Sequence, residues 1–498
     1  MTYIQKTLDI SAKYVQYFFA FLLCSSIFLG VLFRGFYREQ WYIAVCVVIF
    51  VPILIVLYAK LYKKFGNISE KKSLYIFITL CVFVISFQII SAYLLTPESP
   101  KPSDLNIIDY SARLLAEDFD PEVLKGAALP SDVYKYTEFN QDIWKYFQVY
   151  PYQTSVLLLL TFLHKLGISP VVFNIFCLFV SYVLTYLTSK NVYSDNFKPL
   201  SIAIIAAIFP VFYAYTPVYY TDTMAMPFTI GCIYLITCGI KSAEYKNVIY
   251  FALAGITAVL GYFIKASVGI ILPAVVIFLI LTKIPVKKKI VFGSGFFGVF
   301  ICLAIMLNLL IAGTGIYTKD SREEYEFPKT HWVMMGIKSY GGYFSEDFEM
   351  TYQAGNFAEK ERVNIAEIKE RFSEYNVLTF TRHVIVKVSR TWSDGAYFVN
   401  NGYLNSRFVN GKFFNIYSNI VNTCLLFAVI WGFFCGARRK DYGILFLCRV
   451  ILCGLILFLI VWETRSRYLI SFIPLILLMF PELLTLKRPN ALLGGFAP

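Results

Sequence analysis

Long apolar segments alternate with short polar ones along most of this 498-residue chain. An α-helix needs about 20 apolar residues to cross the hydrocarbon core of a bilayer, and twelve segments reach or approach that length. They are Tyr14–Phe33, Trp41–Ala59, Ser73–Leu95, Pro170–Ser189, Leu200–Pro217, Met224–Ile240, Val248–Phe263, Val268–Leu281, Val291–Ile311, Phe414–Cys435, Tyr442–Trp462 and Leu469–Leu486. The pattern predicts an all-α polytopic membrane protein with about 12 transmembrane helices.

A shorter apolar segment, Thr154–Leu166, decides the predicted topology. Its 13 residues would form a helix about 20 Å long, whereas the hydrocarbon core is about 30 Å thick. We therefore expect this segment to lie along the outer membrane surface instead of crossing the membrane. If it crossed, Asp222 would face the cytoplasm and every later loop would change sides.

Basic residues gather in the loops that this topology places in the cytoplasm, as the positive-inside rule requires. The groups are Lys60–Lys72, Lys190–Lys198, Lys283–Lys289, Arg438–Lys440 and Lys487–Arg488. The chain is thus expected to be a multi-pass protein of the cell membrane with both termini in the cytoplasm. Since these loops account for the net charge of +13, the charge does not indicate a nucleic-acid partner.

The chain divides into four predicted parts. Residues 1–72 form an N-terminal transmembrane hairpin and a basic cytoplasmic loop, and residues 73–311 form a transmembrane module whose first external loop spans 96–169. Residues 312–412 form a second external region, in which Ala358–Phe372 is expected to be a surface helix. Residues 413–498 return to the membrane as the C-terminal transmembrane helices.

Three aspartates are the candidate catalytic carboxylates of the external face. Asp104 and Asp109 lie closest to the membrane exit in the acid-rich first loop, where a carboxylate can act as a base or hold a cation. Asp222 lies in a tight external turn between two helices, and the alternative for it is a helix N-cap. Most other acids of the first loop are expected to be solvated.

Two groups of cations are predicted on the same face. Lys265 is isolated in an apolar hairpin, where it binds an anion or extends to the membrane interface. Glu463, Arg465 and Arg467 stand within five residues between two apolar segments, and arginine forks suit a phosphate. The alternative is a salt-bridged turn, in which Glu463 neutralises one arginine and the other needs a further anionic partner.

The second external region offers a weaker candidate for sugar binding. His331 precedes Trp332, and Asp394 lies in the stretch Thr391-Trp392-Ser393-Asp394-Gly395. Such aromatic and polar turns can hold a sugar by stacking and hydrogen bonding. Ordinary packing between loops is the alternative.

Several stretches, taken in order, resemble the C-type glycosyltransferase (GT-C) superfamily. The first external loop leads to Val149-Tyr150-Pro151-Tyr152 and a short surface helix, and the turn Tyr219–Met224 is similar to an acidic turn of oligosaccharyltransferases. Trp462–Ile470 with the later Pro474 is similar to an Arg-Tyr…Pro element of bacterial members. Thr391–Gly395 is similar to Gram-positive members, so the chain resembles the protein-mannosyltransferase and aminoarabinose-transferase-like family 39.

The resemblance implies a GT-C-like bundle with external juxtamembrane helices and an inverting glycosyltransferase. Such enzymes pass a sugar from a polyprenyl-phosphate carrier in the membrane lipid to a cell-envelope glycan or protein acceptor on the external face. In this sequence, Lys265, Arg465 and Arg467 would bind the phosphate and Asp222 would position the acceptor or a metal. Asp104 would be the base, with Asp109 as the alternative, and Tyr152 would contact substrate. The resemblance leaves open whether a divalent cation takes part.

Two other functions compete with this interpretation. A polysaccharide polymerase or ligase acting on lipid-linked oligosaccharide also uses external arginines. A flippase for such lipids should show internal repeats and charged residues within the spans, which the sequence does not show clearly. The sequence contains neither a nucleotide-binding loop nor an HExxH motif, so it does not indicate a sugar-nucleotide donor.

Overall fold

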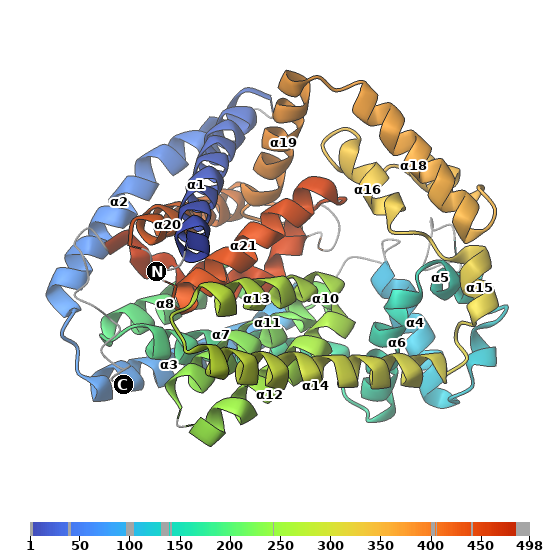
Figure 1. The fold of residues 1–498 in the computed structure, drawn as a ribbon, viewed down its shortest axis with the longest axis horizontal. Helices are drawn as coiled ribbons and strands as arrows, with labels where there is room; N and C mark the ends of the chain where they lie inside the picture. Colours follow the sequence, from blue (N-terminus) through green and yellow to red (C-terminus); the bar gives the residue numbers. More distant parts are fainter. Residues whose placement is uncertain are drawn as a thin grey trace.

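The chain folds into helices joined by loops, with no strand among the residues that the computed structural model describes (Figure 1). These residues are 3–37, 41–95, 104–130, 139, 142–242, 244–399, 404, 406–439 and 442–484. The predicted all-α fold class is therefore confirmed. Lys440, Lys487 and Arg488, which belong to the predicted basic groups, lie outside this set.

The helices fall into four groups along the chain. The first group is α1 (Tyr3–Tyr37), α2 (Trp41–Phe65) and α3 (Glu70–Leu94). The second, which begins with the first predicted external loop, is α4 (Asp104–Glu117), η1 (Pro121–Leu124), α5 (Ile143–Val149), η2 (Pro151–Gln153) and α6 (Thr154–Lys165).

The third group returns to long apolar helices. It comprises α7 (Pro170–Val192), α8 (Phe197–Ile208), α9 (Val211–Ala214), α10 (Thr221–Met224), α11 (Met226–Lys241), α12 (Glu244–Ile264), η3 (Ala266–Ile270), α13 (Ile271–Leu281) and α14 (Val286–Ala312). The fourth contains the external helices α15 (Lys319–Tyr325), α16 (Thr330–Ile337), α17 (Ser345–Tyr352), α18 (Phe357–Ser373) and α19 (Val377–Trp392). The fourth group is completed by the C-terminal helices α20 (Lys412–Arg439), α21 (Ile444–Val461), η5 (Ser466–Phe472), α22 (Ile473–Leu478) and η6 (Phe480–Leu484).

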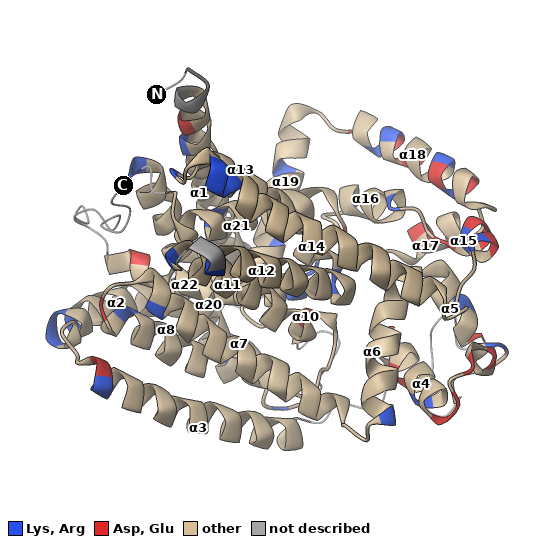
Figure 2. Cartoon of the chain, turned by 60° about the horizontal axis from the view of Figure 1, so that its bottom comes forward, with Lys and Arg blue, Asp and Glu red and all other residues tan. Residues whose placement is uncertain are grey.

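Ten of the twelve predicted spans correspond to helical segments that, among the described residues, are long and apolar enough to cross a membrane. The other two, Leu200–Pro217 and Val268–Leu281, correspond to the shorter apolar helices Phe197–Ile208 and Ala266–Leu281. The predicted span Leu200–Pro217 is interrupted, because α8 has 12 residues, ends at Ile208 and is followed by the separate helix α9. Figure 2 shows that charged residues are sparse along α3, α7 and α14 and collect near helix ends and on the external helices. This distribution is what a bilayer requires, because an unpaired charge in hydrocarbon is costly.

The short helix α6 does not have the length of a span. It has 12 residues, and it packs on α4 through a contact of 2.9 Å between His164 Nε2 and Asp109 Oδ1. The contact ties α6 to the first predicted external loop, which agrees with the expectation that Thr154–Leu166 stays at the surface.

Each end of the helix bundle collects loops that the charge pattern assigned to one side. At one end, Lys190 pairs with Glu70 at 2.7 Å, and Arg439 lies 3.9 Å from Glu482. At the opposite end, Asp222 contacts Lys265 and Arg467. The predicted alternation of the spans therefore agrees with which loops meet in space.

The C-terminal spans form the centre of the bundle. In the most apolar stretch of Ser466–Leu484, 83% of the residues are buried inside the protein. In the most apolar stretch of α14, the buried share is 17%. The segment that begins with Arg467 is thus surrounded by protein, while α14 presents most of its surface outward. A charged residue on the central segment can therefore be paired by other helices instead of facing lipid.

The helices α15–α19 of the second predicted external region form a unit, named the external unit after that prediction, which buries apolar side chains such as Phe348 and polar ones such as His331 and Asp347. The predicted surface helix Ala358–Phe372 is present as α18, which begins with a capping box between Asn356 and Glu359. Inside the unit, Arg371 holds Asp347 through contacts of 2.7 and 3.1 Å. Such paired guanidinium contacts satisfy a buried carboxylate, so this unit has a fixed internal geometry.

The orientation of the bundle gives a first prediction. Lys165 and Lys64 are both exposed, and they lie in loops predicted to be external and cytoplasmic, respectively. In a background with few cysteines, Lys165→Cys is expected to react with a membrane-impermeant maleimide in intact cells, and Lys64→Cys only after permeabilisation. The reverse labelling pattern would mean that the bundle is inverted.

A second prediction concerns acid. Burial lowers the pKa of His331 from its ordinary 6.5 to about 4, with the Asp347 carboxylate opposing the shift. As pH falls below 6.5, His331 therefore binds a proton in the unfolded state before it does so in the folded state. The stabilisation is fully present above pH 6.5 and is lost as pH falls from 6.5 to 4. At pH 5 the loss is on the order of 2 kcal/mol.

Hydrogen exchange of α16 and α17 measures this loss. Their amides are expected to exchange faster at pH 5 than at pH 7, after correction for intrinsic rates, and His331→Asn should reduce the difference. His164→Asn, outside the unit, is the control and should leave the difference unchanged. An equal acid response in wild type and His331→Asn would show that another group is responsible.

Candidate functional site

Three membrane segments start with a charged residue at the same end of the bundle. Asp222 lies in α10, directly before α11. Lys265 is the N-cap of η3, and Arg467 is the second residue of η5. In each case a short irregular turn precedes the regular helix, so the charged side chain stands at the entrance of its span.

These three residues form a buried ion trio. Arg467 Nη1 lies 2.7 Å from Asp222 Oδ2, and Lys265 Nζ forms an ion pair with the other carboxylate oxygen. Asp222 is 2% exposed and Arg467 is 6% exposed. The trio thus contains two basic side chains and one carboxylate, in a place where desolvation makes unpaired charge expensive.

Aromatic rings surround the two cations of the trio. The guanidinium carbon of Arg467 lies 5.0 Å from the ring centres of both Tyr220 and Tyr468. Lys265 Nζ is also 5.0 Å from the Tyr468 ring centre. Cation–π contacts of this kind stabilise charge where water is scarce, and they restrict where the cations can point.

Asp104 is joined to the trio through Tyr220. The Tyr220 hydroxyl donates to Asp104 Oδ2 at 3.1 Å, and Gln153 Nε2 donates to the same hydroxyl at 3.3 Å. Asp104 is the first residue of α4 and is half-buried. A half-buried carboxylate at the edge of a charged cluster has access to solvent and to the cluster.

Glu463 organises the neighbouring turn. Arg465 Nε donates to its Oε1 at 3.0 Å, and the Tyr468 hydroxyl donates to its Oε2 at 2.7 Å. Glu463 is 4% exposed. The sequence left open which anion compensates the second arginine; the structure pairs Arg465 with Glu463 and Arg467 with Asp222, 245 residues away.

Asp109 faces a different set of partners. Its carboxylate accepts from Arg113 Nε at 3.0 Å and lies 2.9 Å from His164 Nε2. It is 7% exposed. The two aspartates of α4 are therefore separated: Asp104 adjoins the trio, and Asp109 joins α4 to α6.

His164 is the residue of this region that sequence reasoning missed as a carboxylate partner. Its side chain is 17% exposed in the pair with Asp109. Only its position on the last turn of α6 could have suggested a contact, and nothing in the local pattern identifies α4 as the neighbour.

The remaining two candidates, His331 and Asp394, make hydrogen bonds that hold neighbouring helices and turns together. His331 Nδ1 lies 2.8 Å from the Thr351 hydroxyl inside the external unit. Asp394 accepts from the Ser466 hydroxyl at 2.6 Å and from the Phe398 amide at 3.0 Å, so it holds the start of η5.

Tyr152 belongs to an aromatic cluster near Glu463. It is 52% exposed, and its ring centre is 5.8 Å from that of Trp332. Trp332 in turn stacks on Trp462 at 5.6 Å with an interplanar angle of 3°. The Trp332 carbonyl accepts from the Glu463 amide at 2.9 Å, so this cluster is directly connected to the charged turn.

Within the described part of the chain, no three His, Cys, Asp or Glu side chains gather in a way that would hold a metal ion. Asp222, the candidate for a metal ligand, has both carboxylate oxygens engaged by cations. Its geometry suits the holding of Lys265 and Arg467.

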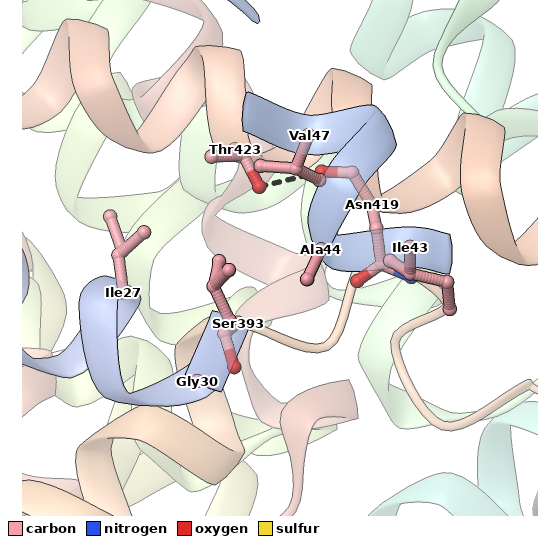
Figure 3. A pocket seen from close by; sticks show the side chains of 9 residues that line it. Ile27, Gly30, Ile43, Ala44, Val47, Ser393, Asn419 and Thr423 are labelled. Carbon is pink, nitrogen blue, oxygen red and sulfur yellow. Dashed lines mark hydrogen bonds between the residues drawn. The ribbon is translucent and has the colours of Figure 1, made fainter. Parts of the chain in front are cut away.

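A small cavity lies apart from the charged residues (Figure 3). It is formed where α1, α2 and α20 meet Ser393, and its lining is mostly apolar. The lining residues are Ile27, Gly30, Val31, Ile43, Ala44, Val47, Ser393, Asn419 and Thr423. None of the charged candidates borders it.

Comparison with known proteins places the chain in a family. The archaeal oligosaccharyltransferase AglB from Archaeoglobus fulgidus, solved with an inhibitory peptide and a dolichol-phosphate, superposes with a TM-score of 0.43 and 12% identity over 85% of this chain. The chain covers 50% of the length of that protein. No curated protein matches the sequence significantly. Residues 8–487 match the family described as "Conserved hypothetical integral membrane protein", and the chain is therefore a member of this family of integral membrane proteins.

Proposed function

We propose that this protein is a membrane glycosyltransferase that moves a sugar from a polyprenyl-phosphate carrier to a cell-envelope acceptor on the external face. The observation that carries the proposal is the buried Lys265–Asp222–Arg467 trio next to the Asp104 carboxylate. The trio brings together three distant parts of the chain at one end of a membrane bundle. Such a transfer requires a place that binds the phosphate of a lipid carrier and a base that takes the proton of the acceptor hydroxyl.

The trio offers a place for the phosphate of the carrier. Both basic side chains contact Asp222 in the structure. A lipid phosphate that approaches Lys265 and Arg467 adds a second anion beside the same two side chains, and the guanidinium fork can hold two phosphate oxygens. Asp222 then keeps both cations in position, while the apolar spans accommodate the polyprenyl chain.

In the proposed transfer, the acceptor hydroxyl oxygen forms a bond to the anomeric carbon of the sugar. The bond between that carbon and the phosphate oxygen breaks, and its electrons leave with the polyprenyl phosphate. Lys265 and Arg467 stabilise the charge that develops on this leaving group. Asp104 takes the proton of the acceptor hydroxyl, and attack from the opposite side of the sugar inverts the anomeric configuration.

The aromatic cluster of Tyr152, Trp332 and Trp462 is suited to the sugar. Aromatic faces bind the apolar face of a pyranose, and exposed Tyr152 lies at the side of the cluster that solvent reaches. The cluster is connected to Glu463 through the Trp332 carbonyl. We expect Tyr152 to contact the sugar or the acceptor, and His331 and Asp394 to support the surrounding helices and turns.

The choice of donor tests the class of reaction. Purified protein in lipid nanodiscs is supplied with a polyprenyl-phosphate monosaccharide or with a polyprenyl-diphosphate oligosaccharide. Release of polyprenyl phosphate from the first donor, dependent on an acceptor fraction from the cell envelope, is the expected result. Turnover of the second donor alone would favour a polymerase or ligase and contradict the proposal.

A third prediction concerns the base. Asp104→Asn is expected to reduce the rate of transfer by about 100-fold or more, because general base catalysis contributes about 10²–10⁴. The control is Glu117→Gln at the other end of α4, where Glu117 is exposed and its loss should be tolerated. The measurement is initial rate at saturating donor, with protein yield as the check on folding. If Asp104→Asn keeps its rate while Asp109→Asn loses it, the base is Asp109.

A fourth prediction concerns the phosphate. Arg467→Lys removes the fork and is expected to raise the KM for the donor roughly tenfold to a hundredfold, as expected for losing a charge-assisted hydrogen bond of about 1.5–3 kcal/mol. Lys265→Ala and Arg465→Lys should act in the same direction. Arg382→Lys, at an exposed position of α19, is the matched control.

Varied donor concentration at saturating acceptor separates this effect from misfolding. A folding defect lowers the amount of active protein and leaves KM unchanged. Unchanged donor dependence in Arg467→Lys and Arg465→Lys would show that both arginines only stabilise the turn, and the phosphate would have to bind elsewhere.

A further inference from the structure

A fully buried lysine joins the external helices to the charged turn. Lys387 of α19 is 0% exposed, and its Nζ donates to three backbone carbonyls: Gly336 at 2.6 Å, Ile460 at 2.9 Å and Trp462 at 2.7 Å. Gly336 lies in the last turn of α16, and Ile460 and Trp462 are at the end of α21. The carbonyls at a helix C-terminus lack partners within the helix, so one ammonium completes two helix ends at once.

The backbones of α16 and of the end of α21 approach each other so closely that glycine is needed at the point of contact. A Cβ added at Gly336 would collide with the carbonyl oxygen of Val461, and one added at Gly341 would collide with Cε of Lys387. Gly341 follows Ser339 and Tyr340, and the three residues have φ of +83°, +36° and +68°, respectively. Such left-handed backbone is unfavourable for residues with a Cβ, so the surrounding contacts must hold this turn in place.

Further hydrogen bonds connect the same junction to the charged turn. The Glu463 amide donates to the Trp332 carbonyl at 2.9 Å, and the Thr464 amide donates to the Gly341 carbonyl at 2.8 Å. The hydroxyls of Thr391 and Thr464 lie 3.0 Å apart. The chain from Trp462 to Thr464 is thereby fixed to α16 and α19 immediately before Arg465 and Arg467.

Burial of a lysine at this place is costly. It lowers the pKa of Lys387 to about 7, with the Glu463 carboxylate acting in the opposite direction. Nearby His383 has its pKa lowered to about 4 by burial, so it is neutral near pH 7 and adds no second charge. An apolar side chain would avoid the desolvation cost, but it would leave three carbonyls without this donor.

We propose that Lys387 is a positioning residue, which fixes the Glu463–Arg467 turn against the external helices and thereby sets the place of Arg467 in the ion trio. Its effect passes through the end of α21, since its ammonium contacts only backbone carbonyls of the junction. Figure 1 shows α16, α19 and the end of α21 meeting beside the external unit. The consequence for donor binding depends on the proposed function, whereas the consequence for backbone order does not.

Hydrogen exchange of the full-length protein in nanodiscs tests the backbone effect. Lys387→Met is expected to speed exchange about tenfold in the peptides that cover 330–342 and 460–468, which corresponds to the loss of about one buried hydrogen bond. The matched control is Lys360→Met, which removes another buried lysine of the external unit; its Nζ donates to the Glu324 carbonyl at 2.6 Å. It should leave both peptides unchanged. Wild-type exchange in Lys387→Met would overturn the proposal.

A milder variant covers the case in which Lys387→Met does not fold. Thr391→Val removes only the hydroxyl contact to Thr464 and the bond to the Lys387 carbonyl. It is expected to speed exchange in the same two peptides by a smaller factor. If Lys387→Met fails to fold and Thr391→Val leaves both peptides unchanged, the proposal is overturned.

Kinetics with the polyprenyl-phosphate donor distinguishes positioning from general structural support. Lys387→Met should raise the KM for the donor about tenfold with a smaller change in kcat, because a displaced Arg467 weakens phosphate binding. A normal KM together with faster exchange would show that the junction does not control the site and would overturn the proposal. Absence of transfer in wild type would refute the proposed function alone, because the exchange measurement would still decide the role of Lys387.

Discussion

The pairing of Asp222 with Lys265 and Arg467 is the interaction on which one end of this bundle depends. Three separate membrane segments begin with these residues, and none of the charges could be buried there alone. Removing one partner would leave a buried charge uncompensated. The three segments are therefore held in one arrangement by electrostatics as well as by packing.

The charged turn after α21 transmits this constraint to the external helices. The buried Glu463 accepts a hydrogen bond from Arg465, while Asp394 holds Ser466 at the start of η5. On the other side, the Lys387 ammonium and the close approach of Gly336 fix the preceding residues. The position of Arg467 is thus determined from both directions along the chain. If this site aligns a lipid phosphate with a carboxylate from another helix, as we propose, it needs such support, because small displacements cost much of the catalytic effect.

The separation of Asp104 from Asp109 shows how one helix can serve two purposes. Asp109 fixes α4 to α6 through His164 and Arg113. That contact leaves Asp104, at the beginning of the same helix, next to Tyr220. The carboxylate that is fully engaged is the structural one, and the half-buried carboxylate near the trio is the better candidate for proton transfer.

The sequence by itself determined the membrane class and the positions of most of the long apolar helices, because helix length and hydrophobicity are local properties measured against a fixed bilayer thickness. It also identified Asp222, Lys265 and Arg467 as unusual, since isolated charges between apolar segments need compensation. Which charge compensates which was decided only by the tertiary structure. Asp222 and Arg467 are 245 residues apart, and their contact depends on the packing of whole helices. The same holds for Lys387, whose partners are backbone carbonyls that no side-chain pattern reveals.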